Sequence, residues 1–282
     1  MSSDISPLQA RTLLRRYELK PRKTLGQNFL VNAGARESII EIAGLNPGEV
    51  VLEIGPGLGA LTERLVEEAG RVVAVELDEA LFQILKTTLG DIHNLELVLG
   101  DILEFAPADL GLDRGYVVVA NIPYNITSAV IRHLMESKIP AARVVLTVQK
   151  EVAERIVAGP GDMSLLALSV QVFGAASIRA QISRGSFYPT PTVDSSVVHI
   201  KMHSSNYLNP ADLGTFFKLA RAGFGQKRKQ LRNALSGGMP IDKPAAEQLL
   251  QSCGIEPSSR AQRLSVEDWM RLSKAYQSYR GS

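Results

Sequence analysis

The residues best suited to bind a ligand stand directly after short apolar runs that have the composition of buried strands. In chain order they are the loop Glu53–Gly59, the acids Glu76 and Asp101, and the segment Asn121-Ile-Pro-Tyr124. Ligands of open α/β sheets bind where the carboxyl ends of parallel strands meet. We therefore expect these residues to surround one binding crevice.

The loop Glu53-Ile-Gly-Pro-Gly-Leu-Gly59 separates an apolar run from a stretch with helical composition. Glycine lets a backbone approach a ligand closely, and the helix that follows offers free N–H groups. Gly55 and Gly57 also open a match to the dinucleotide pattern G-x-G-x-x-G/A, and Glu76 stands where a ribose-binding acid is expected. A nicotinamide-dependent dehydrogenase is therefore one interpretation.

The acids around this loop favour a different ligand. Glu53 places a carboxylate where the pyrophosphate of a dinucleotide would lie, which disfavours that dianion. Glu53, Glu76 and Asp101 together suit a ligand that is cationic or rich in hydroxyl and amino donors. S-adenosylmethionine has a sulfonium, an ammonium, a ribose diol and an adenine amine, so it fits better. Asp101 also precedes Ile-Leu-Glu in a way that suits a helix cap, and both interpretations stay open for it.

Alternating strands and helices must position these residues. Apolar runs predict strands, and stretches with helical composition lie between several of them; this alternation predicts a doubly wound, mostly parallel Rossmann-like α/β sheet. The expected strands are Val50–Ile54, Arg71–Glu76, Leu95–Leu99, Tyr116–Ala120, Arg143–Val148 and Val193–Met202, and the expected helices are Ala35–Ala43, Ala60–Ala69 and Asp78–Leu89.

The pattern changes after the polar segment His203–Pro210. Beyond it, only helices are expected, at Leu213–Arg221, Gln226–Leu235, Ala245–Ser252 and Val266–Tyr279. We therefore divide the chain into a basic arm (residues 1–34), an α/β domain (35–204) and a small all-helical domain (205–282).

Charge is concentrated in two basic segments, although the net charge of the 282-residue chain is only +2. Residues 11–24 contain six Lys or Arg against Glu18 alone, and residues 218–232 contain six with no acid. Clustered cations gain from counterion release, so we expect a nucleic acid as partner.

Other classes of protein are disfavoured. A single cysteine, Cys253, excludes an intramolecular disulfide and a cysteine-based zinc site. Neither a signal peptide nor a stretch long enough to span a bilayer is visible, so we expect a cytoplasmic protein without membrane contact. Hydrolase-elbow, P-loop and H-E-x-x-H motifs are absent from the sequence, and we expect no metal.

Eight segments form a recognisable series along the chain: Leu25–Leu30, Glu53–Gly59, Val75–Asp78, Gly100-Asp101, Asn121-Ile-Pro-Tyr-Asn-Ile126, Gln149–Arg155, Val193–Val197 and the basic motif Phe224–Leu235. In these segments and their order, nearly the whole chain resembles the KsgA/RsmA-type rRNA adenine N6-dimethyltransferases. One departure is Met163-Ser-Leu-Leu-Ala-Leu-Ser169, where many members have Tyr-Gly-x-Leu-Ser.

The resemblance implies a role for each site residue. Asn28 and Leu30, at the end of the basic arm, would close over the methionine end of S-adenosylmethionine, and Gly55 and Gly57 would pass beneath it. Glu76 would take the ribose hydroxyls and Asp101 the adenine amine. Asn121 would stand beside the reacting methyl, and Tyr124 and Phe187 would sandwich the target base. The residues expected to bind RNA are Arg22, Lys23, Lys227, Arg228, Lys229 and Arg232.

The resemblance further implies dimethylation of adenine N6 on two adjacent adenosines near the 3′ end of small-subunit rRNA, in a pre-30S particle, by a monomer that also serves small-subunit biogenesis. One alternative is a large-subunit rRNA methyltransferase of the macrolide-resistance type. Another is a binding module on the same fold without catalysis, which an intact Asn121 and Tyr124 disfavour.

Overall fold

The computed structural model describes residues 7–203, 210–226 and 228–281. The chain forms two compact units, one from Met1–Ala153 with Ala175–Met202 and the other from Glu154–Gly174 with His203–Ser282. Among the described helices, none has the length and apolar character needed to cross a membrane.

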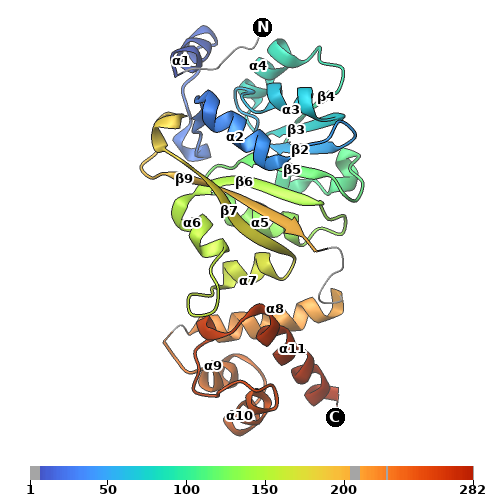
Figure 1. Cartoon of the computed structure of the whole chain (residues 1–282), viewed down its shortest axis with the longest axis vertical. Helices are drawn as coiled ribbons and strands as arrows, with labels where there is room; N and C mark the ends of the chain where they lie inside the picture. Colours follow the sequence, from blue (N-terminus) through green and yellow to red (C-terminus); the bar gives the residue numbers. More distant parts are fainter. Residues whose placement is uncertain (1–6, 204–209, 227, 282) are drawn as a thin grey trace. The chain divides into compact units, whose positions relative to one another are not determined.

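A seven-stranded sheet forms the first unit, with the strand order β4-β3-β2-β5-β6-β9-β7 (Figure 1). Strands β2 to β6 run parallel to one another, and β9 pairs antiparallel with β6. The predicted doubly wound, mostly parallel sheet is confirmed. The strands are β2 (Val50–Ile54), β3 (Arg71–Glu76), β4 (Leu95–Leu99), β5 (Val117–Asn121), β6 (Arg143–Gln149), β7 (Gly174–Ile182) and β9 (Ser195–Met202).

Strand order reverses at β2, which lies between β3 and β5. The chain therefore winds outward in both directions from this point, and a crevice opens beyond the carboxyl ends of the central strands. The helices that connect the strands are α2 (Ala33–Ala43), α3 (Thr62–Glu68), α4 (Glu79–Leu89), α5 (Thr127–Met135) and α6 (Lys150–Ile156), with short 3-10 turns at Ile102–Glu104, Pro107–Leu110 and Arg184–Ser186.

Side-chain caps fix where two of these helices begin. The Asn32 side chain accepts a hydrogen bond from the Ala35 N–H at the start of α2, and the Asp78 side chain accepts one from the Ala80 N–H at the start of α4. Such caps satisfy backbone donors that the first helical turn leaves unpaired. The cap at Asp78 places α4 immediately after the end of β3.

Arg143, at the start of β6, ties the end of α2 to the sheet. Its guanidinium donates to both carboxylate oxygens of Glu49 at 2.7 Å, and to the carbonyls of Ala43 and Gly44 at 2.7 and 2.8 Å. The hydrogen bonds from Arg143 hold the pKa of Glu49 below its ordinary value.

The basic arm folds against this unit. Helix α1 (Pro7–Arg16) buries Ala10 and Leu14 in an apolar cluster with Phe29 and Leu58. A 3-10 turn (Lys23–Leu25) then leads to β1 (Phe29–Leu30), which pairs antiparallel with β8 (Phe187–Tyr188).

The second unit is helical. It contains α7 (Leu165–Gln171), α8 (Pro210–Gly225), α9 (Leu231–Gly238), α10 (Lys243–Ser252), α11 (Val266–Gly281) and a 3-10 turn at Ala261–Arg263. The helix expected at Gln226–Leu235 is wrong in its first turn, because α9 begins only at Leu231, where the N–H donates to the Ser259 carbonyl at 2.7 Å.

Residues 154–174, expected in the α/β domain, group with the C-terminal helices. Met163 and Leu168 share a buried cluster with Phe216 and Trp269, which explains this grouping. The departure at Met163-Ser164 has a local role, because Met163 is buried in that core and Ser164 caps α7 through the Ala167 N–H.

Candidate active site

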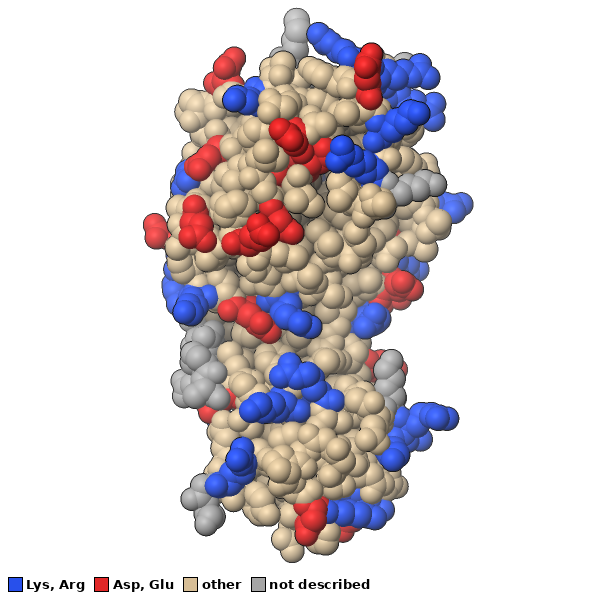
Figure 2. Space-filling view, turned by 180° about the vertical axis from the view of Figure 1, so that it is seen from behind, with Lys and Arg blue, Asp and Glu red and all other residues tan. Residues whose placement is uncertain are grey.

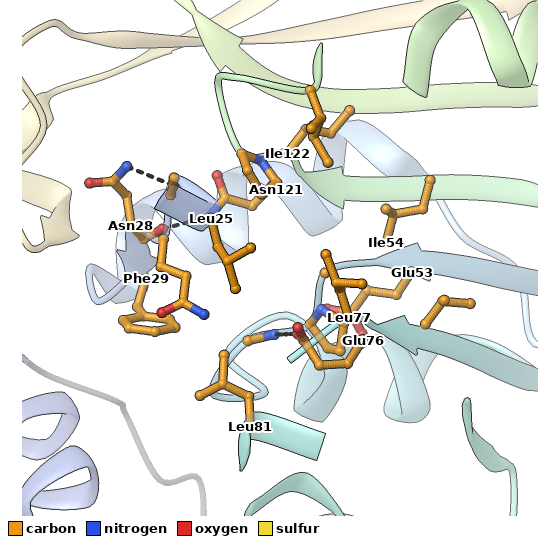
Figure 3. A pocket seen from close by; sticks show the side chains of 18 of the residues that line it. Leu25, Asn28, Phe29, Glu53, Ile54, Glu76, Leu77, Leu81, Asn121 and Ile122 are labelled. Carbon is orange, nitrogen blue, oxygen red and sulfur yellow. Dashed lines mark hydrogen bonds between the residues drawn. The ribbon is translucent and has the colours of Figure 1, made fainter. Parts of the chain in front are cut away.

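A cavity lies at the carboxyl ends of β2, β3 and β5, as the strand order predicts (Figure 3). The segment Leu25–Leu30 lies along it. All seven residues expected to bind the cofactor line this cavity together with Tyr124: Asn28, Leu30, Gly55, Gly57, Glu76, Asp101 and Asn121. Histidine is not among the lining residues, and the structure describes all four histidines.

The glycine loop after β2 presents bare backbone to this cavity. Gly55 and Gly57 have φ angles of +66° and +62°, in the left-handed region that favours glycine. A Cβ on Gly55 would meet nothing within 4 Å, whereas one on Gly57 would lie 3.1 Å from the ring of Phe29. A ligand can therefore approach closely at Gly55, and the loop packs tightly against β1 at Gly57.

Glu76 ends β3 as a buried carboxylate with both oxygens engaged. One oxygen accepts a hydrogen bond from the Gly57 N–H at 3.0 Å and the other from the Asp78 N–H at 2.9 Å (Figure 3 shows the first). Burial raises its pKa above the ordinary value. A carboxylate has about four acceptor positions. Glu76 lines the cavity, so the acceptor capacity that its backbone hydrogen bonds leave unused suits a hydroxyl-rich ligand such as a vicinal diol.

Asp101 caps a short turn and also lines the cavity. One of its oxygens accepts from the Leu103 N–H at 2.9 Å and caps the short turn at Ile102–Glu104. The residue also lines the cavity, with the second oxygen available to an amine donor.

Glu53 differs from the charged group expected from the sequence. Burial raises its pKa to about 8, and its carboxyl accepts a hydrogen bond from the Thr62 hydroxyl at 2.7 Å. The side chain is therefore mostly neutral at pH 7, and the charge-based argument against a pyrophosphate loses most of its force.

Asn121 and Tyr124 form the other wall. The Asn121 amide nitrogen donates to the Asn28 carbonyl at 3.0 Å, which fixes the orientation of the amide and leaves its oxygen as an acceptor (Figure 3). The Tyr124 hydroxyl lies 2.8 Å from the hydroxyl of buried Ser195, so the ring is held from its far end. The Pro123 carbonyl already accepts from the Ile126 N–H and the Thr127 hydroxyl.

Phe187 is not among the residues that line this cavity. Its side chain is only 2% exposed and belongs to the apolar core formed with Leu30, Ile39 and Val197. Its β8 strand pairs with β1, so burial of the ring anchors the segment beside the cavity. The structure therefore brings Tyr124 to the cavity but not Phe187.

The expected RNA-binding residues fall into several environments. Arg22 is exposed, with its guanidinium 3.5 Å from the Asp78 carboxylate. Arg228 and Lys229 are exposed between α8 and α9, whereas Arg232 pairs with Glu247 at 2.8 Å. Lys227 lies outside the described residues, and the side chain of Lys23 is not described. Figure 2 shows that basic side chains are more frequent than acidic ones on the displayed face of the C-terminal helices.

Sequence reasoning missed two lining residues with hydrogen-bonding side chains, Gln27 and Asn125. Both stand inside the sequence motifs Leu25–Leu30 and Asn121–Ile126. Their position next to the expected site residues is the sequence signal that could have identified them as lining residues.

Residues 18–278 match the family model described as ribosomal RNA adenine dimethylase. The chain belongs to this family. The resemblance inferred from the motifs is confirmed, and the dehydrogenase interpretation is wrong.

Individual relatives support the same family assignment. Ribosomal RNA small subunit methyltransferase A of Dehalococcoides mccartyi (strain CBDB1) is 46% identical over 269 residues, which cover 95% of this chain and 92% of that protein. The protein of the same name from Moorella thermoacetica is 38% identical over 98% of this chain and 100% of its own length.

Two crystal structures share the fold. A dimethyladenosine transferase from Plasmodium falciparum has a TM-score of 0.75 and 27% identity, covering 88% of this chain and 96% of that chain. The 23S rRNA methyltransferase ErmE has a TM-score of 0.71 and 26% identity, covering 89% and 100%.

Proposed function

We propose that this protein is an S-adenosylmethionine-dependent methyltransferase that dimethylates adenine N6 in small-subunit rRNA. The observation that carries the proposal is that two walls of one cavity offer different hydrogen-bond acceptors, a carboxylate on one wall and an amide oxygen on the other. Glu76 offers a buried carboxylate held by the Gly57 and Asp78 N–H groups, and Asn121 offers an oriented amide oxygen.

The residues present fit the cofactor. The open space above Gly55 admits a ligand against the backbone, and the carboxylate of Glu76, which lines the cavity, suits a ribose diol. The second oxygen of Asp101 suits the adenine amine, and Asn28 and Leu30 would cover the methionine end. When bound, S-adenosylmethionine supplies a methyl group on an electrophilic sulfonium.

The chain's own residues would prepare the amine. An exocyclic adenine nitrogen is a poor nucleophile, because its lone pair is delocalised into the ring. The Asn121 oxygen and the Ile122 carbonyl would each accept a hydrogen bond from one of its N–H groups, which favours a pyramidal nitrogen with its lone pair directed away from the ring. Of the two candidate carbonyls we favour that of Ile122, since that of Pro123 already accepts two hydrogen bonds.

In this mechanism, most of the reduction of the activation barrier comes from holding the amine and the methyl donor in a productive geometry. Holding two reactants in a productive geometry can supply ~7–11 kcal/mol of a barrier. A base strong enough to ionise the amine is not needed, because the ammonium formed by transfer is acidic and loses its proton readily. The ring of Tyr124, held through Ser195, would stack on the extruded base, which is worth ~1–3 kcal/mol.

The target that we propose is a pair of adjacent adenosines near the 3′ end of small-subunit rRNA in a pre-30S particle, modified by a cytoplasmic monomer. Curated relatives named for the small subunit match at 34–46% identity over most of the chain, which supports this target over the large-subunit alternative. The exposed cations Arg228 and Lys229 would contact the RNA backbone.

Mass mapping of modified adenosines tests this proposal. The protein and cofactor are incubated with undermethylated small-subunit particles and, in parallel, with unmodified large-subunit rRNA. We expect N6,N6-dimethyladenosine at two neighbouring positions of the small-subunit rRNA alone. Modification of the large-subunit RNA alone would favour the alternative, and modification of neither would refute the activity.

A further inference from the structure

The side chain of Gln27 bridges two parts of the chain beside the cavity. Its oxygen accepts a hydrogen bond from the Arg22 N–H at 2.8 Å, and its nitrogen donates to the Asp78 carboxylate at 2.9 Å. The first contact folds residues 22–27 into a compact turn. The second fastens that turn to the loop between β3 and α4, 51 positions further along the chain.

Asp78 connects this contact to the wall that holds Glu76. Its carboxylate is 5% exposed, with one oxygen capping α4 through the Ala80 N–H and the other receiving Gln27 and facing Arg22. Its backbone N–H donates to Glu76 at 2.9 Å. The hydrogen bond from Gln27 to Asp78 therefore attaches the turn to the side of the cavity where the ribose is expected.

The opposite wall holds the same segment at two further points. The Asn125 amide donates to the Thr24 carbonyl at 3.2 Å, and the Asn121 amide donates to the Asn28 carbonyl at 3.0 Å. At Gly26, with φ +62°, a Cβ would lie 2.8 Å from the Asn125 side chain, so the approach leaves no room for a larger residue. Residues 22–30, which we call the closing segment, thus span the cavity from one wall to the other.

We propose that Gln27 is a positioning residue that holds the closing segment over the cofactor cavity through Asp78, and that opening of this contact governs how fast the cofactor enters and leaves. The inference rests on the proposed function. Each S-adenosylmethionine gives one methyl, so dimethylation of one adenine needs the closing segment to release one spent cofactor and admit another.

The Gln27–Asp78 bond has the strength for this role. Hydrogen bonds to charged groups are strong enough to change an opening equilibrium by roughly 10- to 100-fold. Loss of the bond should leave the Asn121 and Asn125 contacts intact in the closed state, so that only the opening equilibrium changes. The expected signature is a faster cofactor off-rate and a higher KM for the cofactor, with nearly unchanged kcat at saturation.

A swap of the two side chains isolates the contact from general destabilisation. Gln27→Glu alone sets two carboxylates against each other, and Asp78→Asn alone sets two amide groups in place of amide and carboxylate. The double variant Gln27→Glu/Asp78→Asn restores one donor and one acceptor, while Asn at 78 still suits the cap of α4. Gln83→Ala, at an exposed glutamine of α4, is the matched control.

Two measurements test the proposal on the full-length protein. Hydrogen exchange of the amides of residues 22–30 is followed without cofactor or RNA, and the dissociation rate of S-adenosylhomocysteine is followed by surface plasmon resonance. Gln27→Ala and both single swap variants should exchange and release roughly 10- to 100-fold faster than the parent. The double variant should return to within a few-fold of the parent, and the control should match it.

Parent-like exchange and release in Gln27→Ala would overturn the inference, as would a double variant that is as fast as the singles. The proposed function fails differently. A parent protein that does not bind S-adenosylhomocysteine would contradict the cofactor assignment, whereas the exchange measurement would still decide whether Gln27 holds the closing segment.

Discussion

The side-chain amide of Asn121 donates a hydrogen bond to the backbone carbonyl of Asn28, although the two residues are 93 positions apart in the chain. One residue ends β5 at the wall proposed to hold the adenine amine, and the other belongs to the closing segment. The bond settles which way the amide of Asn121 faces. In the proposed mechanism this bond would couple closure over the cofactor to the orientation of the acceptor that prepares the nucleophile.

Glu76→Ala should lower affinity for S-adenosylmethionine by roughly 10- to 100-fold, because two ribose hydroxyls lose a charged acceptor. Isothermal titration calorimetry measures the change, and Glu79→Ala, which removes an exposed acid three residues away, is the control. An unchanged dissociation constant in a folded Glu76→Ala protein would remove this residue from the cofactor site.

Glu53 should make the stability of the parent depend on pH. An unfolded Glu ionises near pH 4.3, whereas burial holds the folded pKa of Glu53 at about 8. Between these values the folded state binds the extra proton, so the free energy of unfolding should fall by about 1 kcal/mol per pH unit as pH rises. Glu53→Gln should lose this dependence while it keeps an acceptor for the Thr62 hydroxyl.

Denaturant unfolding from pH 5 to pH 8 gives both curves. Parallel slopes for Glu53→Gln and the parent would show that Glu53 does not retain its proton in the folded protein.

Tyr124→Phe should keep most of the methyl transfer, since the ring does the stacking. It should nevertheless lose about 1–3 kcal/mol of stability, because the buried hydroxyl of Ser195 is left without its partner. Tyr124→Ala should slow transfer strongly. Single-turnover rates and thermal unfolding separate the two effects, and a Tyr124→Phe protein as inactive as Tyr124→Ala would assign the hydroxyl a part in the chemistry.

Simultaneous replacement of Lys227, Arg228 and Lys229 by Ala should weaken binding to small-subunit particles and reduce its salt dependence. The slope of log K against log salt should fall by up to roughly 0.7–0.9 for each lost phosphate contact. The control replaces Lys243, Arg260 and Lys274, three exposed cations of the other C-terminal helices and loops, and changes the net charge equally. Equal slopes for the two triple variants would show that the 227–229 segment has no special contact with RNA.

The sequence predicted best where local pattern and burial agree. Strands β2, β3 and β4 have the expected bounds, because each is a short, mostly apolar run followed within two residues by a glycine or an acid. Strand β7 was not anticipated. It lies at the edge of the sheet and alternates small and polar residues such as Ser177 and Arg179, so it carries little hydrophobic signal.

Contacts between segments far apart in the chain determine the features that local sequence patterns did not predict. The pairing of β1 with β8 joins segments more than 150 residues apart, and it is this pairing that accompanies the burial of Phe187. The residues Gln226–Gln230 are strong helix formers by composition, yet α9 starts after them because Leu231 bonds to a distant loop. Local residue propensities carry no information about either of these two long-range contacts.

A variant of Asn121 separates the methyl-transfer step from the binding of the particle. In the proposed mechanism its oxygen accepts a hydrogen bond that strengthens as the adenine nitrogen becomes pyramidal, so it contributes chiefly in the transition state. Single-turnover transfer to undermethylated small-subunit particles, with cofactor saturating, measures this contribution. Asn121→Ala should transfer on the order of 100-fold more slowly while it binds particles as the parent does. Transfer by Asn121→Ala at the parent rate, with binding unchanged, would contradict the assignment of this cavity wall to the chemistry.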